Sequence, residues 1–177
     1  KVIDGVLTEV QNRDMLILKK SSYAFWKGVT KIGNGAFKGV DELFRLTIPE
    51  GVESIGDEAF RDCVNLKHIN LPDSVKIVGH YAFAGCEVLK EITLSDKTKV
   101  IREGTFENCK SLREFNIPQN VTMINMAAFK GCEALESIII PNTTKSIGES
   151  AFSGCSSLKN LHIGENVVSI GARAFES

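Results

Sequence analysis

Apolar residues recur along the chain in a pattern that restarts every 23 residues. From Ile32 the pattern runs through six full copies without insertion or deletion, and a seventh copy begins at Ile170. The full copies span 32–54, 55–77, 78–100, 101–123, 124–146 and 147–169. A period of this size is typical of a repeat protein, in which each unit is too small to bury its own apolar face and stacks on its neighbours.

Each copy contains one segment with the alternation of a β-strand. A leucine is followed by an apolar residue three positions later and by another two positions after that, as in Leu66, Ile69 and Leu71. The step of two predicts a short strand whose intervening side chains point outward. Because identical connections link successive copies, neighbouring strands must be parallel, and the pattern predicts one continuous parallel sheet. Prolines that end the strand follow it in four copies: Pro49, Pro72, Pro118 and Pro141.

A phenylalanine marks a second element in every copy. These residues are Phe37, Phe60, Phe83, Phe106, Phe129, Phe152 and Phe175. Residue types that tolerate a left-handed backbone stand two positions after the first six: Gly39, Asp62, Gly85, Asn108, Gly131 and Gly154. Because such a residue closes a helical turn, the pattern predicts one short helical turn per copy.

A glycine precedes most of these phenylalanines by four positions, and Arg102 and Asn125 interrupt this column. A positive φ at Arg102 would cost about 1 kcal/mol relative to glycine. We therefore expect the copy 101–123 to differ locally from the others.

The cysteines form a ladder of their own with a step of 23 residues: Cys63, Cys86, Cys109, Cys132 and Cys155. An odd number leaves at least one thiol free, and no two cysteines stand at the spacing of a few residues that zinc ligands need. Free cysteine packs as a small apolar residue, and Val40 takes the same position in the first copy. We therefore expect buried thiols, no metal site and no cofactor.

These columns resemble a known family. The strand segment has the signature of a leucine-rich repeat, and the rest of the unit closely resembles the 23-residue BspA-like, or Treponema-type, class. The residues that carry the resemblance, in one copy, are Ile55, Gly56, Ala59, Phe60, Cys63, Leu66, Ile69, Leu71 and Pro72. The resemblance covers 23–177 and implies an α/β repeat solenoid. In this leucine-rich-repeat horseshoe a concave parallel β-sheet faces short helical turns and short strands on the convex side.

The domain organisation follows from where the repeats begin. Residues 23–177 form the predicted repeat domain, with one degenerate repeat, six full repeats and one truncated repeat. Residues 1–22 are predicted to form an N-terminal cap resembling a β-hairpin, because the pair Asp4-Gly5 lies between apolar residues. Since the chain starts at Lys1 and stops at Ser177 within a repeat, we expect it to be part of a longer protein.

Composition and charge narrow the function classes. A net charge of −1 with no basic run argues against nucleic-acid binding, and no apolar run is long enough to span a membrane. His68 and His162 lie four repeats apart, roughly 20 Å by strand spacing, so they cannot converge in a catalytic triad. The five cysteines belong to the predicted core, and no phosphate-binding glycine loop is present. The chain is therefore predicted not to be an enzyme.

Outward-pointing strand residues give the candidate binding surface on the concave sheet. The predicted contact residues are Arg45, Thr47, His68, Asn70, Glu91, Thr93, Glu114, Asn116, Ser137, Ile139, Asn160 and His162. Strand spacing places Glu91 beside Glu114, where both are either solvated or ready to receive a basic side chain of a partner. Lys67, Lys90 and Arg113 form a basic edge. Phe44 and Trp26 are expected to pack against the cap, with exposure as interface anchors the alternative.

Members of the resembled class are largely surface-exposed or secreted proteins of bacteria and some protozoan parasites, and they are implied to act as adhesins. The resemblance therefore implies a non-enzymatic module of an extracellular or cell-surface adhesin. Its partner would be a protein, such as a host matrix or cell-surface protein, bound through the concave sheet. A structural spacer that displays another domain and an intracellular interaction scaffold, which would suit unpaired thiols, are the alternatives. We expect a monomer, with end-to-end association through an exposed end rung.

Overall fold

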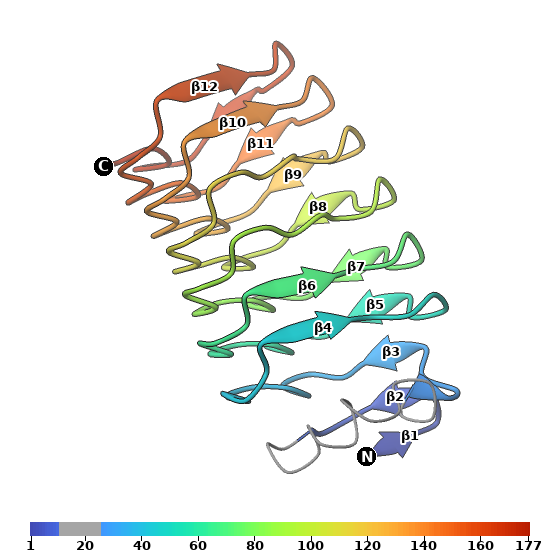
Figure 1. Ribbon diagram of the computed structural model, residues 1–177. Coiled ribbons are helices and arrows are strands. Elements are labelled where there is room, and N and C mark those ends of the chain that lie inside the picture. The colour runs from blue at the N-terminus through green and yellow to red at the C-terminus, as the bar shows by residue number, and fades with distance from the viewer. Residues whose placement is uncertain (11–25) are drawn as a thin grey trace.

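The computed structural model describes residues 1–10 and 26–177, and the repeats stack along one axis from the N-terminus to the C-terminus (Figure 1). Two series of strands line the stack, and we call them the primary sheet and the secondary sheet. The primary sheet contains β4 (Arg45–Thr47), β6 (His68–Asn70), β10 (Ser137–Ile140) and β12 (Asn160–Ile163). The secondary sheet contains β1 (Val2–Ile3), β2 (Val6–Leu7), β3 (Lys31–Ile32), β5 (Ser54–Ile55), β7 (Ile77–Val78), β8 (Val100–Ile101), β9 (Met123–Ile124), β11 (Ser146–Ile147) and β13 (Ser169–Ile170).

The strands pair at the register of the sequence repeat. Leu46 lies opposite Ile69, and Ile138 lies opposite Leu161, in parallel pairs of the primary sheet. Residues 23 positions apart are therefore neighbours, and the same columns face inward in every repeat. The prediction of parallel strands with alternating inward and outward side chains is confirmed along β4, β6 and β10.

At the N-terminus β1 and β2 form an antiparallel hairpin around Asp4 and Gly5, which both have positive φ. β2 then pairs in parallel with β3, so the hairpin extends the secondary sheet beyond the first full repeat. Leu7 is completely buried by this arrangement. The predicted boundary between residues 22 and 23 lies outside the described residues.

The predicted helical turns are wrong, because residues 32–177 contain no helix. The segment around each phenylalanine is a series of tight turns: in the first full repeat Lys38 N–H donates to Gly35 O at 3.0 Å. Phe37 N–H instead donates to Ala59 O of the next repeat at 2.7 Å. A helix needs every N–H for its own i→i+4 bonds, and here alternate N–H groups bond the neighbouring repeat.

The left-handed positions predicted after the phenylalanines are confirmed, with φ between 59° and 74°. A second left-handed column was not predicted, since its residue types give no hint of it: Gly35, Glu58, Tyr81, Gly104, Ala127, Ser150 and Arg173. Each non-glycine residue of this column costs roughly 1–2 kcal/mol in backbone strain. A hydrogen bond donated to the next repeat offsets part of that cost at Glu58, Tyr81, Ala127 and Ser150. Glu58 N–H, for example, donates to His80 O at 2.8 Å.

Two ladders of side chains fill the core. The phenylalanine rings of successive repeats stack with centroids 4.8–5.7 Å apart and planes within 21° of parallel. All five cysteines are free and buried, which confirms the prediction. Each thiol donates to the carbonyl of a phenylalanine one repeat earlier, for example Cys109 Sγ–H to Phe83 O at 3.2 Å. The thiols thus satisfy a backbone acceptor as well as filling space.

The prediction of one continuous parallel sheet is wrong, because both sheets are interrupted between the repeats 78–100 and 101–123. We call this boundary the seam. Among the described residues, β7 and β8 do not pair, and single bridges join Glu91 only to His68 and Glu114 only to Ser137 (Figure 1). Turn hydrogen bonds still cross the seam, including Tyr81 N–H to Glu103 O at 2.9 Å. The two repeats are therefore joined at their turns and separated at their sheets.

Larger residues in the repeat 101–123 explain the seam. Repeats pack so closely that a Cβ atom at Gly79 would lie 2.5 Å from Asp57 N, and Arg102 occupies the equivalent position one repeat later. Asn125 also replaces this glycine, yet β8 and β9 still pair, so one side chain is not sufficient. The same repeat also has Thr105 in the alanine column and Phe115 in an aliphatic column.

The excess volume is visible in the core. Phe115 packs against Phe106 and Phe129 at 5.0 and 4.9 Å, and the Phe83–Phe106 separation of 5.7 Å is the widest step in the phenylalanine stack. Overpacking of a core forces backbone shifts. The expectation that this repeat differs locally is confirmed, although Arg102 does not have a positive φ and close approach is the cause.

We predict that Phe106→Ala lowers the free energy of unfolding by about 3–5 kcal/mol, because the ring is completely buried between two others. Phe44→Ala is the control, since Phe44 is 56% exposed and its loss should change stability by less than about 0.5 kcal/mol. Urea denaturation followed by circular dichroism measures both values. Equal losses for the two variants would contradict the stacked core.

We predict that the five thiols do not react with a disulfide reagent until the protein unfolds. Burial raises the pKa of Cys63 and Cys155 from an ordinary value of 9.0 to about 12. Above about pH 9 the unfolded chain releases thiol protons that the folded chain retains, so stability falls as pH rises through this range. Thiol titration with and without denaturant, and unfolding at about pH 8 and about pH 10, check both statements. Rapid labelling of the folded protein would refute them.

We predict that the seam weakens hydrogen-exchange protection locally. Thr122 N–H donates to Lys99 O and Asn125 N–H donates to Ile101 O, whereas within the described residues the N–H groups of Lys99 and Arg102 have no protein acceptor. Amide exchange at Lys99 and Arg102 should therefore be faster than at Thr122 and Asn125 in the same experiment. Equal protection at the four amides would show that the sheets are closed in solution.

Candidate functional site

The twelve residues predicted to contact a partner all lie on the outward face of the primary sheet. Eleven side chains are exposed and His68 is half-buried. β4, β6, β10 and β12 and the bridge segments at Glu91 and Glu114 present them in adjacent rows. The pairing Arg45–His68 and Ser137–Asn160 shows that they follow the stack in register.

In one pair of the predicted contact residues, the side chains lie within hydrogen-bonding distance of each other. His68 Nδ1 lies 3.2 Å from Glu91 Oε1 across neighbouring repeats. The predicted pairing of Glu91 with Glu114 does not form, because the seam lies between them and each bridges to the repeat on its other side. Like charges directly opposite one another disfavour strand pairing, so these two carboxylates contribute to the interruption.

The seam hollows the primary sheet. A cavity of about 300 Å³ lies here, lined by Thr93, Asp96, Phe115, Asn116 and Ile139 among other residues. Ile139 is 64% exposed on the sheet surface. Three of the predicted contact residues, Thr93, Asn116 and Ile139, therefore surround one depression that combines an apolar side chain with two polar ones.

The flanking residues follow the predictions only in part. Arg113 Nη2 binds Glu136 Oε1 at 2.5 Å, and this pairing lowers the pKa of Glu136. Arg113 is thus not a free member of the predicted basic edge. Trp26 is buried and stacks on Phe37 at 6.5 Å, whereas Phe44 is exposed. The expected packing against the cap is wrong for Phe44. Trp26 is buried against Phe37 of the first full repeat, and because residues 11–22 of the predicted cap lie outside the described residues, its packing against the cap stays a prediction.

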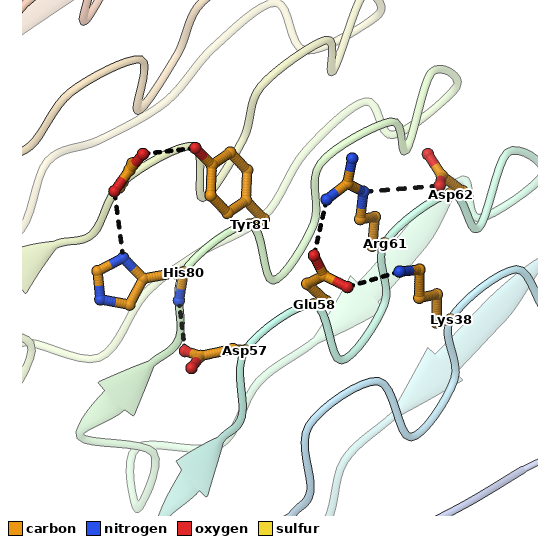
Figure 2. Close-up of polar contacts among 8 residues, drawn as sticks. Lys38, Asp57, Glu58, Arg61, Asp62, His80 and Tyr81 are labelled. Carbon is orange, nitrogen blue, oxygen red and sulfur yellow. Dashed lines mark hydrogen bonds and ion pairs between the residues drawn. The ribbon is translucent and has the colours of Figure 1, made fainter.

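A polar network on the turn side of the stack was not predicted from the sequence. Figure 2 shows Glu58 between Lys38 and Arg61, with Oε2 and Oε1 at 2.6 and 2.7 Å from the two basic groups. The hydrogen bond from Lys38 lowers the pKa of Glu58. Arg61 also lies 5.6 Å from the ring centroid of Tyr81. One connected polar surface therefore runs across three consecutive repeats, from Lys38 through Glu58 and Arg61 to Tyr81.

The second half of the network reinforces the turn side of the seam. His80 N–H donates to Asp57 Oδ1 at 2.8 Å, and Tyr81 Oη donates to Glu103 Oε1 at 2.5 Å (Figure 2). His80 Nδ1 lies 3.8 Å from Glu103 Oε2. The sequence signal that could have indicated the His80 bond is Asp57 directly after Gly56, because Asp side chains accept backbone N–H groups at turns.

The surroundings of Tyr81 and of the cysteines disfavour their deprotonated forms. The hydrogen bond to Glu103 raises the pKa of Tyr81 to about 12, which disfavours the phenolate. Desolvation raises the pKa of every cysteine, whereas a nucleophilic thiol needs a lowered pKa.

Within residues 1–10 and 26–177, no group of acidic, histidine and cysteine side chains is arranged to hold a metal ion. In the same residues no helix is long and apolar enough to cross a membrane.

Solved structures resemble this chain closely. A leucine-rich repeat protein of T. pallidum is 34% identical, with a TM-score of 0.76, and the match covers 81% of this chain and 67% of that protein. A leucine-rich cell surface protein of Faecalibacterium prausnitzii is 32% identical, with a TM-score of 0.67, over 77% of this chain and 46% of that one. A leucine-rich repeat protein of Eubacterium ventriosum is 25% identical, with a TM-score of 0.74, over 84% of this chain and 40% of that one.

The chain therefore spans two thirds of the first of these proteins and less than half of the other two. No curated protein matches it. The family model described as the BspA-type leucine-rich repeat region matches residues 18–136 and 122–177, in six copies. Together with the 23-residue register and the stacked phenylalanine core, this match shows that the chain belongs to the BspA-type leucine-rich repeat family.

Proposed function

We propose that this chain is a non-enzymatic protein-recognition module that binds a partner protein through the outward face of its primary sheet. The observation that carries the proposal is the depression at Thr93, Asn116 and Ile139 within a row of exposed polar side chains. Protein interfaces centre on a water-excluding apolar contact with a polar rim. Repeat proteins of this family are typical protein-interaction modules.

The proposed setting is a bacterial cell surface, where the module acts as an adhesin for a host matrix or cell-surface protein. The cell-surface protein of Faecalibacterium prausnitzii, which this chain resembles, supports the setting. Free thiols are compatible with it, since all five are buried and an oxidant in solvent cannot reach them. Burial of the thiols thus removes the feature that favoured an intracellular scaffold.

The module is proposed to act as a monomer and to associate end to end only at high concentration. Leu161, Val168 and Ile170 are exposed in the last rungs described, and they offer apolar surface for such contacts. Analytical ultracentrifugation over a range of concentrations distinguishes the two states.

We predict that Ile139→Glu weakens binding to a purified host matrix protein by about tenfold or more, since a charge then occupies the apolar centre of the contact. Binding of the chain to immobilised fibronectin, laminin and collagen, measured by biolayer interferometry, is the assay. A structural spacer would bind none of them.

Met123→Glu provides the matched control for this experiment. Met123 is also an exposed apolar residue, 43% accessible, but it lies on the secondary sheet. The control should bind as the unchanged chain does. Equal loss in both variants would place the contact elsewhere, and no binding to any of the three proteins would overturn the adhesin proposal.

A further inference from the structure

The seam opens a second groove on the secondary sheet, and this groove shares Asp96 with the depression described above. We propose that this groove binds an extended acidic segment of a partner protein. The groove has a volume of about 560 Å³, within the range of ordinary ligand sites. Six of the residues that line it are Lys76, Ile77, Lys97, Lys99, Val100 and Arg102. We call it the seam groove.

The positive charge of the seam groove favours an acidic occupant. Four of its side chains are cationic and one, Asp96, is acidic. In the part of the chain that the structure describes, the ammonium groups of Lys97 and Lys99 make no ion pair, and Lys76 approaches Glu53 only at 3.7 Å. Arg102 Nη1 lies 3.4 Å from His80 Nε2, a neutral or cationic neighbour. These cations are therefore available to carboxylates from outside the chain.

The backbone at the seam groove also has hydrogen-bonding groups to offer. In the other repeats, the residue equivalent to Lys99 donates its N–H to the preceding repeat, as Lys76 does to Glu53 O at 2.9 Å. Across the seam neither Lys99 nor Arg102 donates to the preceding repeat, and the carbonyl groups of Lys76 and Val78 accept no bond among the described residues. An extended peptide has both the donors and the acceptors that such a sheet interruption leaves open.

Apolar side chains complete the match to a peptide. Ile77 is 49% exposed and Val100 is half-buried beside it on the next strand. Met123 takes the equivalent position on β9 opposite Val100 and is also exposed, so the apolar row extends one strand beyond the groove. An extended segment in which acidic and apolar residues alternate would place its apolar side chains on this row and its carboxylates toward the lysines.

Other anions fit the seam groove less well. A single inorganic anion would fill only a fraction of it and would contact none of the apolar row. Single-stranded nucleic acid is bound through exposed aromatic side chains, and the residues that line this groove include none. A sulfated glycan could use the cations but not the row of Ile77 and Val100, so it is tested below as the competing occupant.

Fluorescence anisotropy of a labelled synthetic peptide in which glutamate and leucine alternate tests the proposal. We expect saturable binding that weakens as salt is added, because the attraction is screened. The double variant K97E/K99E should lower affinity by about tenfold or more, since two attractive charges become repulsive. Thermal unfolding by circular dichroism checks that each variant is folded.

The matched control is K31E/K145E, which changes the net charge equally. Lys31 lies on β3 and Lys145 directly precedes β11 of the secondary sheet, and neither lines the seam groove. This control should bind the peptide as the unchanged chain does. Ile139→Glu should also leave peptide binding intact, so that failure of this proposal is separate from failure of the function proposed for the primary sheet.

Two results would overturn the proposal. If K31E/K145E weakens binding as much as K97E/K99E, the attraction is a general charge effect with no defined groove. If labelled heparin binds with sensitivity to K97E/K99E and the peptide does not bind, the occupant is a sulfated glycan. Binding of the peptide that depends on Lys97 and Lys99, with heparin failing to compete at equal charge concentration, supports it.

Discussion

The close approach of consecutive backbones governs this structure. Each repeat donates N–H groups to its neighbour at the turns and, away from the seam, at both sheets, with bonds such as Phe60 N–H to Ala82 O at 2.8 Å. This spacing leaves no room for a Cβ atom at Gly148, where one would lie 2.4 Å from Met126 N. It also holds the phenylalanine rings in contact. Every repeat matches its neighbour at these points, and the six full copies from 32 to 169 contain no insertion or deletion.

The seam shows what happens when one repeat exceeds that spacing. The repeat 101–123 has larger side chains at Arg102, Thr105 and Phe115, and the sheets separate while the turns stay bonded. Tyr81 and Glu103 reinforce the bonded side, and Gly104 leaves room for the Tyr81 ring that a Cβ atom would fill. A local departure from the repeat therefore produces hollows on both faces of the stack, and the hollows share Asp96.

The interior of this protein is committed to packing, so the recognition proposed for it lies on its surfaces. The thiols bond backbone carbonyls, and the buried rings stack on one another. The outward faces are free to vary without disturbing either ladder. A uniform stack would offer only flat sheets, whereas the seam provides depressions where water can be excluded from a contact. Both proposed binding sites lie at this one irregularity.

The sequence by itself determined the repeat length, the parallel register, the burial of the cysteines and the outward columns of the primary sheet. Each of these depends on residue spacing alone, since equal intervals force equal positions. Only the tertiary structure decided that the turns are not helical, because their N–H groups bond the next repeat. The left-handed column at Glu58 and Tyr81 was likewise decided by inter-repeat bonds, and those residue types carry no signal for it. The sequence marked Arg102 as anomalous, but the interruption of both sheets depends on how closely the folded repeats approach at Arg102 and on where Phe115, Glu91 and Glu114 then lie.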